Sequence, residues 1–172
     1  MDNLLVDMMT DEDMAQACFD RLVRVKVEMC RRIAAAGVDI IIYGDDVGTQ
    51  KAMMMNPALW KKWIKPVTQA VIQAAKSVNP DILCYYHSDG VINDIIPDLI
   101  EIGVDILNPV QPECMDPAEI KMLYGDKLSF WGTIGTQTTM PFGSPQDVEN
   151  TVAERIKTVG CGGGLVIAPT HL

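Results

Sequence analysis

The sequence predicts an α/β protein built on a parallel sheet, because short apolar segments alternate with helical patterns along the whole chain. Each apolar segment ends at polar residues, as expected where parallel strands finish at one edge of a sheet. Parallel strands need crossovers, and one helical pattern lies between each apolar segment and the next. The five segments span residues 38–43, 81–84, 104–107, 128–131 and 164–168.

A repeated phrase favours a barrel over a doubly wound sheet. Gly-Val-Asp-Ile stands at 37–40 and again at 103–106, each time between a helix and a strand. We therefore predict a partial TIM (β/α) barrel of about five αβ units out of eight. Strands this apolar are expected to be covered on both faces.

The chain is short for a complete barrel. Its 172 residues hold about five units, whereas eight usually need about 250 residues. We expect one domain over 1–172 that forms the carboxyl-terminal part of a barrel and lacks the first strands and the closing helix. Such a domain would associate with itself or with a partner that completes the barrel.

The first long helix is predicted over 11–36, with Thr10 and Asp13 as a capping pair. Apolar residues three and four apart form a stripe along it that should be buried. This stripe consists of Met14, Cys18, Leu22, Val25, Met29 and Ile33.

The other helices follow from similar spacing. Asn56-Pro57 should begin the second helix, and Pro66 should kink or split it. Shorter helices are expected at 92–102 and 117–124, and Ser144-Pro145 should open the last one. The apolar stripes are Trp60, Ile64, Val67, Val71, Ala74 and Val78 in the second helix, and Val148, Val152, Ile156 and Val159 in the last.

Composition excludes several classes of protein. The net charge of -9 argues against nucleic-acid or anionic-membrane binding, which needs clustered Lys and Arg. No apolar run approaches the roughly 20 residues of a membrane span, and no signal peptide begins the chain, so a cytoplasmic location is expected. The five cysteines form no Cys-x-x-Cys pair and are expected to be reduced. Small-molecule substrates or protein partners fit this composition best.

The strongest functional signal is Tyr85-Tyr86-His87-Ser88-Asp89-Gly90, which ends the second strand. Residues two apart in a strand point to the same face, so His87 and Asp89 should converge at its carboxyl end. Parallel α/β folds place their chemistry at that end. A lone histidine more often bonds to nearby backbone, but His171, the only other histidine, also lies at a strand end.

Other strand ends offer further candidates. Asp45 and Asp46 follow the first strand; they either cap the loop through Asx-type hydrogen bonds or reach the pocket, Asp46 as a base and Asp45 as a substrate contact. Gln111 and Trp131 either line a substrate pocket or serve in a backbone bond and in core packing, respectively. The Gly162-Gly163-Gly164 run precedes a strand, which indicates a turn and not a phosphate cradle.

These strand ends resemble those of a known family. The motifs resemble the carboxyl-terminal part of the uroporphyrinogen decarboxylase (URO-D) superfamily, a group of TIM barrels. It contains the decarboxylase of tetrapyrrole biosynthesis and corrinoid-dependent methyltransferases that pass a methyl group to a thiol or a pterin. The motifs lie at 44–50, 87–90, 103–112, 130–134 and 163–171.

The methyltransferase branch implies a metal site. In that branch a His-x-Cys strand end and a later cysteine hold a zinc that activates the acceptor thiol. The matching positions here are His87, Asp89 and His171, so both cysteines are replaced by residues that still bind metals. The resemblance implies a divalent metal on these three residues, with His87 also catalytic. Zinc is favoured, although iron, manganese and cobalt accept the same donors.

Three functions follow as hypotheses. The first is a metal-dependent methyltransferase that works with a partner protein carrying a corrinoid. The second is a uroporphyrinogen decarboxylase without metal, in which a carboxylate stabilises a protonated pyrrole ring and cationic residues from elsewhere bind the substrate's carboxylates. The third is a half-barrel that is inactive until another chain completes it.

Overall fold

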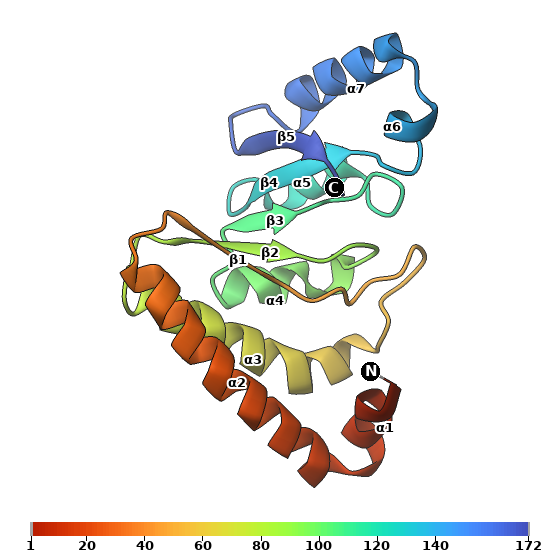
Figure 1. Ribbon diagram of the computed structural model, residues 1–172. Coiled ribbons are helices and arrows are strands. Elements are labelled where there is room, and N and C mark those ends of the chain that lie inside the picture. The colour runs from red at the N-terminus through yellow and green to blue at the C-terminus, as the bar shows by residue number, and fades with distance from the viewer. Residues whose placement is uncertain (1, 172) are drawn as a thin grey trace.

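The computed structural model describes residues 2–171, whose strands form one parallel sheet (Figure 1). The sheet order follows the chain order, β1-β2-β3-β4-β5, without the reversal that a doubly wound sheet shows. The prediction of a partial TIM-barrel-like α/β fold is confirmed. The strands are β1 (Ile40–Gly44), β2 (Leu83–His87), β3 (Ile106–Asn108), β4 (Ser129–Ile134) and β5 (Leu165–Pro169).

Helices precede β1 and connect each strand to the next. Two of them, α1 and α6, have no counterpart among the predicted helices, while α5 has the predicted bounds. The helices are α1 (Asp2–Thr10), α2 (Glu12–Ala35), α3 (Pro57–Lys76), the 3-10 helix η1 (Asn93–Ile95), α4 (Ile96–Glu101), α5 (Pro117–Tyr124), α6 (Thr139–Phe142) and α7 (Pro145–Thr158).

The two faces of the sheet are covered differently. Figure 1 looks onto a face that no helix crosses, with α4 and α5 behind the strands. Side chains alternate along β2, so Cys84 and Tyr86 are buried under the helices, while Leu83 on the other face is 43% exposed. We call these the helix face and the open face. The prediction that both faces would be covered is wrong for the residues described.

The main core lies between the helix face and the helices. Tyr86, Leu107 and Phe130 occupy neighbouring register positions on three strands and are almost completely buried. They pack in one cluster with Trp60 and Val71 from α3. Most of the predicted stripe of α3 is therefore core.

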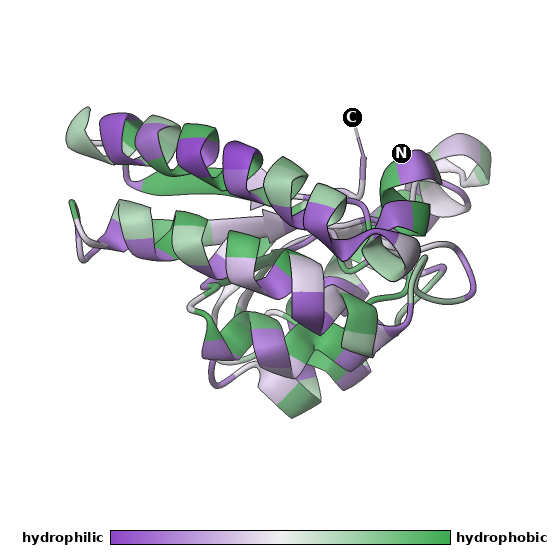
Figure 2. Cartoon of the chain, turned by 90° about the horizontal axis from the view of Figure 1, so that it is seen from below, coloured by the Kyte–Doolittle hydropathy of each residue, from purple (hydrophilic) through white to green (hydrophobic). Residues whose placement is uncertain are grey.

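The predicted stripe of α2 is a different case, because it is exposed. Met14, Val25 and Met29 are each more than half exposed, and α2 packs against α3 through Ala15 and Phe19 instead. The rings of Phe19 and Trp63 stack in this contact, with their centroids 5.6 Å apart. The prediction that the stripe is buried is wrong, since α2 carries apolar residues on two sides and only one side meets α3. Figure 2 shows the mixed hydropathy of these helices from below.

Helices α2 and α3 each differ from prediction in one feature. Asp11, not Thr10 or Asp13, is the N-cap of α2, and its carboxylate accepts a hydrogen bond from the backbone N–H of Met14. Helix α3 runs through Pro66 without a break, because the buried residues around it hold the helix against the core. Of the two predicted alternatives, a kink or a split at Pro66, the split is wrong.

The start of helix α7 and the turn before strand β5 agree with prediction. Ser144 and Asp147 form a capping box at the start of α7. Of the predicted α7 stripe, Val159 is buried, whereas Ile156 is 55% exposed. The three glycines before β5 all have positive φ angles, as the turn interpretation requires.

The structure also bears on the cysteines and on membrane spans. All five cysteines are free thiols. Within residues 2–171, no helix is both long enough and apolar enough to span a membrane.

Candidate functional site

The site lies where the carboxyl ends of β1 and β2 meet. Gly44 is the last residue of β1 and lies beside His87, the last residue of β2. A Cβ atom on Gly44 would lie 2.3 Å from the carbonyl oxygen of His87, so only glycine allows this approach. The backbone of β1 thereby carries the following loop close to the imidazole.

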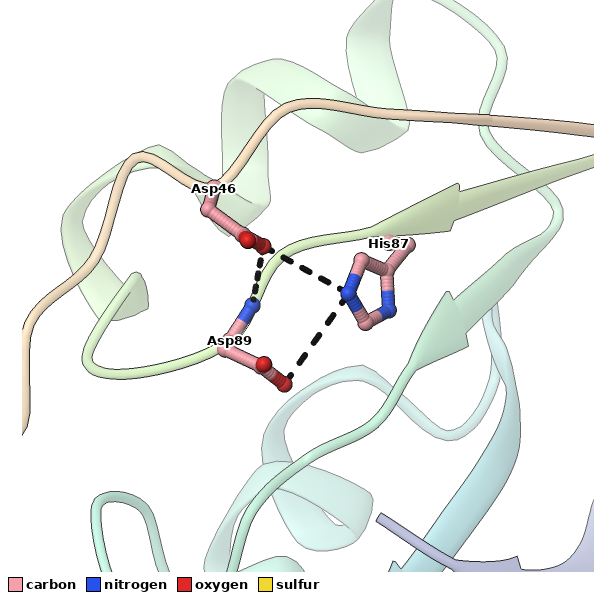
Figure 3. Close-up of side chains that lie close together, drawn as sticks. All are labelled: Asp46, His87 and Asp89. Atoms are coloured by element: carbon pink, nitrogen blue, oxygen red, sulfur yellow. Dashed lines mark hydrogen bonds and ion pairs between the residues drawn. The ribbon is translucent and has the colours of Figure 1, made fainter. Parts of the chain in front are cut away.

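Three side chains converge at this point (Figure 3). Nε2 of His87 lies 3.4 Å from Oδ1 of Asp46 and 3.9 Å from Oδ1 of Asp89. Potential metal-ligand atoms of all three residues lie within 4.8 Å of one another. The cluster is partly accessible, because the side chain of Asp46 is 58% exposed and that of His87 is 31% exposed. It can bind a cation or exchange protons with a ligand.

His87 and Asp89 converge although the strand ends at His87. Ser88 between them is buried, and its hydroxyl accepts a hydrogen bond from the backbone N–H of Val47 at 3.1 Å. Its own N–H donates to the carbonyl of Asn108 at 3.1 Å, which continues the strand pattern one residue further. The alternation on which the prediction rested therefore persists into the loop.

The loops after β1 and β2 lie directly against each other. The backbone N–H of Asp89 donates to Oδ1 of Asp46 at 3.1 Å, and that of Val91 donates to the carbonyl of Thr49 at 2.9 Å. Gly48 and Gly90 make this contact possible, because a Cβ on either would meet the opposite backbone at 2.5 Å. Asp46 thus both faces His87 and ties the two loops together.

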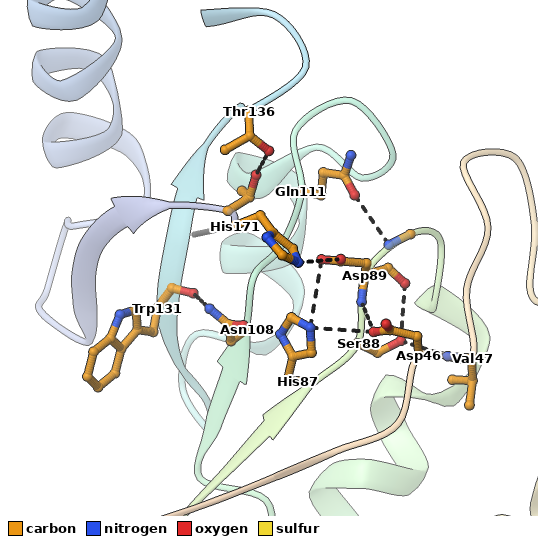
Figure 4. A network of polar contacts seen from close by, with 12 residues as sticks. Asp46, Val47, His87, Ser88, Asp89, Asn108, Gln111, Trp131, Thr136 and His171 are labelled. Atoms are coloured by element: carbon orange, nitrogen blue, oxygen red, sulfur yellow. Dashed lines mark hydrogen bonds and ion pairs between the residues drawn. The ribbon is translucent and has the colours of Figure 1, made fainter. Parts of the chain in front are cut away.

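His171 approaches the cluster from the other side, after β5 (Figure 4). Its Nε2 lies 3.8 Å from Oδ2 of Asp89, and its side chain is 62% exposed. The compact group of potential ligands comprises Asp46, His87 and Asp89, so the predicted set of His87, Asp89 and His171 shares two members with it. Asp46, predicted as a base, is the third member of this group in place of His171.

The predicted substrate contact Asp45 points to a different environment. Its carboxylate accepts a hydrogen bond of 3.1 Å from the hydroxyl of Tyr43, whose ring is tilted against that of Tyr86 on the helix face. Burial raises the pKa of the Asp45 carboxyl, and the neighbouring Lys26 partly offsets this rise. Asp45 and Asp46 are therefore adjacent in sequence but belong to different faces of the sheet.

Gln111 holds loops together. It is 3% exposed, its Oε1 accepts from the backbone N–H of Gly90, and its amide donates to Gln50, both at 3.3 Å. The structure thus places it in the backbone bond that the sequence offered as an alternative, next to the loop that carries Asp89.

Trp131 lies on the open face and lines a cavity of about 1070 Å³ that also includes His87 and His171. Its ring meets Tyr85 edge to face at 5.5 Å. Aromatic and aliphatic side chains form much of the wall, and His87 is the one member of the polar cluster that lines it. Besides these residues the wall includes Ile42, Asn108, Met140 and Ala168.

Sequence reasoning missed Asn108, which links the cluster to β4. Nδ1 of His87 lies 2.5 Å from Oδ1 of Asn108, whose amide nitrogen donates to the carbonyl of Trp131 at 2.6 Å (Figure 4). The sequence does contain a signal for Asn108, because this residue ends an apolar strand as His87 does. A buried polar residue at that position needs hydrogen-bond partners.

A parallel sheet ordered along the chain, with a polar cluster at the carboxyl ends of its strands, defines a partial TIM-barrel-like α/β fold. The family model described as Uroporphyrinogen decarboxylase (URO-D) matches residues 1–172, and the chain belongs to that family.

Further comparisons add little to this assignment. Among solved structures, the chain is similar to the crystal structure of an uncharacterized protein, with 15% sequence identity and a TM-score of 0.46. That match covers 85% of this chain but only 38% of the other. A search of curated proteins finds no match.

Proposed function

We propose that this chain carries the metal site of a methyltransferase that moves a methyl group between a corrinoid protein and a thiol or pterin acceptor. Asp46, His87 and Asp89 would hold a divalent metal, with zinc favoured, and His171 would approach from β5. The observation that carries the proposal is the convergence of three ligand-type side chains within 4.8 Å at the strand ends of a URO-D family member.

The donor atoms fit such an ion. Zinc binds imidazole nitrogen and carboxylate oxygen at about 2.0 to 2.2 Å, so two ligands of one ion lie roughly 3 to 4 Å apart. The two Nε2–Oδ1 distances, 3.4 and 3.9 Å, lie in this range. Imidazole and carboxylate donors also suit iron, manganese and cobalt, and the experiment below therefore compares metals.

A metal bound here would lower the pKa of an acceptor thiol and so make it a nucleophile at neutral pH. The residues of the chain supply the surroundings. Asp46 is the most exposed member of the cluster and lies where it can complete the ligand set or accept the acceptor's proton. Tyr85 and Trp131 offer an apolar wall against which an acceptor can pack and from which water is displaced.

The cavity gives less support to a decarboxylase in this chain. A tetrapyrrole substrate with several carboxylates needs cationic side chains to bind them. The cavity wall formed by the described residues includes His87 and His171 but no lysine or arginine. The carboxylates of Asp46 and Asp89 beside His87 would repel such a substrate unless a cation lay between them.

Metal content is the decisive measurement. The purified chain should take up close to one equivalent of zinc, measured by elemental analysis and by calorimetric titration with zinc, iron, manganese and cobalt salts. His87→Ala should weaken zinc binding by more than about 100-fold, because a ligand contributes more than an outer partner. Asp94→Asn, which alters an exposed acidic residue in η1 that is not a member of the cluster, should bind zinc like the wild type.

Asp46→Asn separates a chemical role from a structural one. The amide keeps the shape and can still contact the loop of Asp89, but it loses the charge and basicity. We expect weaker metal binding with an unfolding free energy close to that of the wild type. A folded wild type that binds none of the four metals would refute the proposal, and so would equal zinc affinity in His87→Ala.

A further inference from the structure

Asn108 ends β3 beside His87, and its side chain is almost fully buried. The two residues are register partners on β2 and β3, and Asn108 is 6% exposed. Its side chain makes two hydrogen bonds, one to Nδ1 of His87 at 2.5 Å and one to the carbonyl of Trp131 at 2.6 Å. Asn108 therefore connects β2, β3 and β4 in one polar chain.

The orientation of this amide is fixed by chemistry. The backbone carbonyl of Trp131 can only accept, so the NH₂ group of Asn108 must face it. With the amide turned around, two oxygen atoms would face each other at 2.6 Å without a proton between them. Oδ1 of Asn108 consequently faces His87, and an amide oxygen accepts hydrogen bonds but never donates them.

The orientation of Asn108 dictates where neutral His87 carries its proton. Nδ1 must be the protonated nitrogen, because it is the donor to Oδ1 of Asn108. Nε2 then presents a lone pair to the carboxylates of Asp46 and Asp89 at 3.4 and 3.9 Å. A lone pair facing two negative groups is favourable only when a cation lies between them.

Without Asn108, we expect neutral His87 to favour the Nε2–H tautomer. The carboxylates of Asp46 and Asp89 attract a proton to Nε2, and a protonated Nε2 cannot bind a metal. The hydrogen bond from Nδ1 to Asn108 is shorter than either contact at Nε2, and it counteracts this attraction. We infer that Asn108 is a positioning residue that holds His87 in the Nδ1–H tautomer and keeps Nε2 available to a cation. The benefit for metal binding rests on the proposed function.

The tautomer can be observed directly by NMR. The chain contains only two histidines, so a sample labelled with ¹⁵N-histidine gives two imidazole patterns, and His171→Gln assigns them. Spectra are recorded at about pH 9 without metal, to observe the neutral imidazoles. In the wild type, Nδ1 of His87 should be protonated and Nε2 should not. In Asn108→Leu, the proton should move to Nε2.

Zinc titration provides the second readout. Asn108→Leu should bind zinc roughly 10- to 100-fold more weakly than the wild type, the usual cost of losing an outer partner of a ligating histidine. Asn108→Asp keeps an acceptor oxygen for Nδ1 and should retain the Nδ1–H pattern, although it loses the donor to the carbonyl of Trp131 and should be less stable than the wild type. Thr68→Val serves as control, because it removes a buried hydroxyl in α3 and should leave the His87 pattern unchanged. Asn108→Ala replaces the leucine variant if that variant does not fold.

The outcomes are distinct. An Nε2–H pattern in the wild type, or an Nδ1–H pattern that survives in Asn108→Leu and Asn108→Ala, overturns the inference. A tautomer switch with unchanged zinc affinity overturns the role in metal binding. A tautomer switch in a chain whose wild type binds no metal supports the positioning of His87 by Asn108 and refutes the proposed function alone.

Discussion

The helix face and the open face of the sheet use similar residues for different purposes. On the helix face, Leu107 and Phe130 are completely buried, whereas Ile42 and Val166 on the open face are 68% and 46% exposed. Both faces are built by the same five strands, so strand propensity does not separate them. What separates them is cover: the helices bury one face, and the described residues leave much of the other accessible.

This difference divides stability from chemistry. The buried face supplies the apolar area that drives folding. The open face carries Tyr85 and Trp131 towards the cavity, and at its carboxyl edge His87 and Asn108 are presented in one register row. At this edge the side chain of His87 is 31% exposed and therefore accessible to a ligand.

Two leucines on opposite faces give the most severe test of this division. Leu107→Ala should lower the free energy of unfolding by about 3 to 5 kcal/mol, because it removes a fully buried side chain from the core and leaves a cavity. Leu83→Ala makes the same chemical change on β2, where the side chain is 43% exposed, and should cost less than about 1 kcal/mol. Urea unfolding of both variants measures the difference. Equal costs would show that the open face is packed as tightly as the helix face.

A second test concerns the ion pairs that join α3 to α4 within the helix layer. Asp98 is buried and pairs with Lys65 at 2.8 Å and with Lys61 at 2.9 Å. Asp98→Asn should cost about 2 kcal/mol, because it leaves the two lysines without their shared carboxylate. Glu101→Gln is the matched control: Glu101 also pairs with Lys65 but its side chain is 69% exposed, so the cost should stay below about 1 kcal/mol.

The same carboxylate makes stability depend on pH. Burial alone would raise the pKa of Asp98, but the bonds from Lys65 and Lys61 outweigh it and hold the pKa below its usual value. Its contribution is therefore present above the unfolded pKa of about 3.9 and is lost as the pH falls through the lower folded value. Unfolding midpoints of wild type and Asp98→Asn should differ by a constant amount between about pH 5 and 8 and converge below about pH 4. A gap that persists at low pH would assign the effect to packing.

Much of the fold follows from the sequence because periodicity and turn residues are local signals. Strand positions and the bounds of α5 are examples, since Asp116 and Pro117 mark the start of that helix unambiguously. The exposed stripe of α2 shows the limit. Periodicity finds apolar residues on one side of a helix, but whether another element covers that side depends on tertiary packing. Helix α2 has Ala15 and Phe19 on its covered side and Val25 on the uncovered one.

The site was predictable to a similar degree. Alternation placed His87 and Asp89 together, because it depends only on neighbouring residues. The closeness of Asp46 depends on two loops that approach through Gly48 and Gly90, which are separated by 41 intervening residues. Asn108 acts through the register of β2 against β3, and register between strands is a tertiary property. These contacts require the fold to be known.

The smallest effect on stability is expected on the open face, where association should respond instead. An apolar surface of this kind favours contact between chains, so light scattering of the wild type should show a mass above that of one chain that rises with concentration. Ile42→Lys places a charge on the most exposed position and should weaken association about tenfold or more, while the unfolding free energy changes by no more than about 0.5 kcal/mol. Val25→Lys on α2 is the control for the other exposed apolar surface. If Val25→Lys abolishes association and Ile42→Lys does not, the α2 stripe mediates association. A wild type that stays monomeric at every concentration contradicts the prediction, because the open face is then stable in contact with solvent.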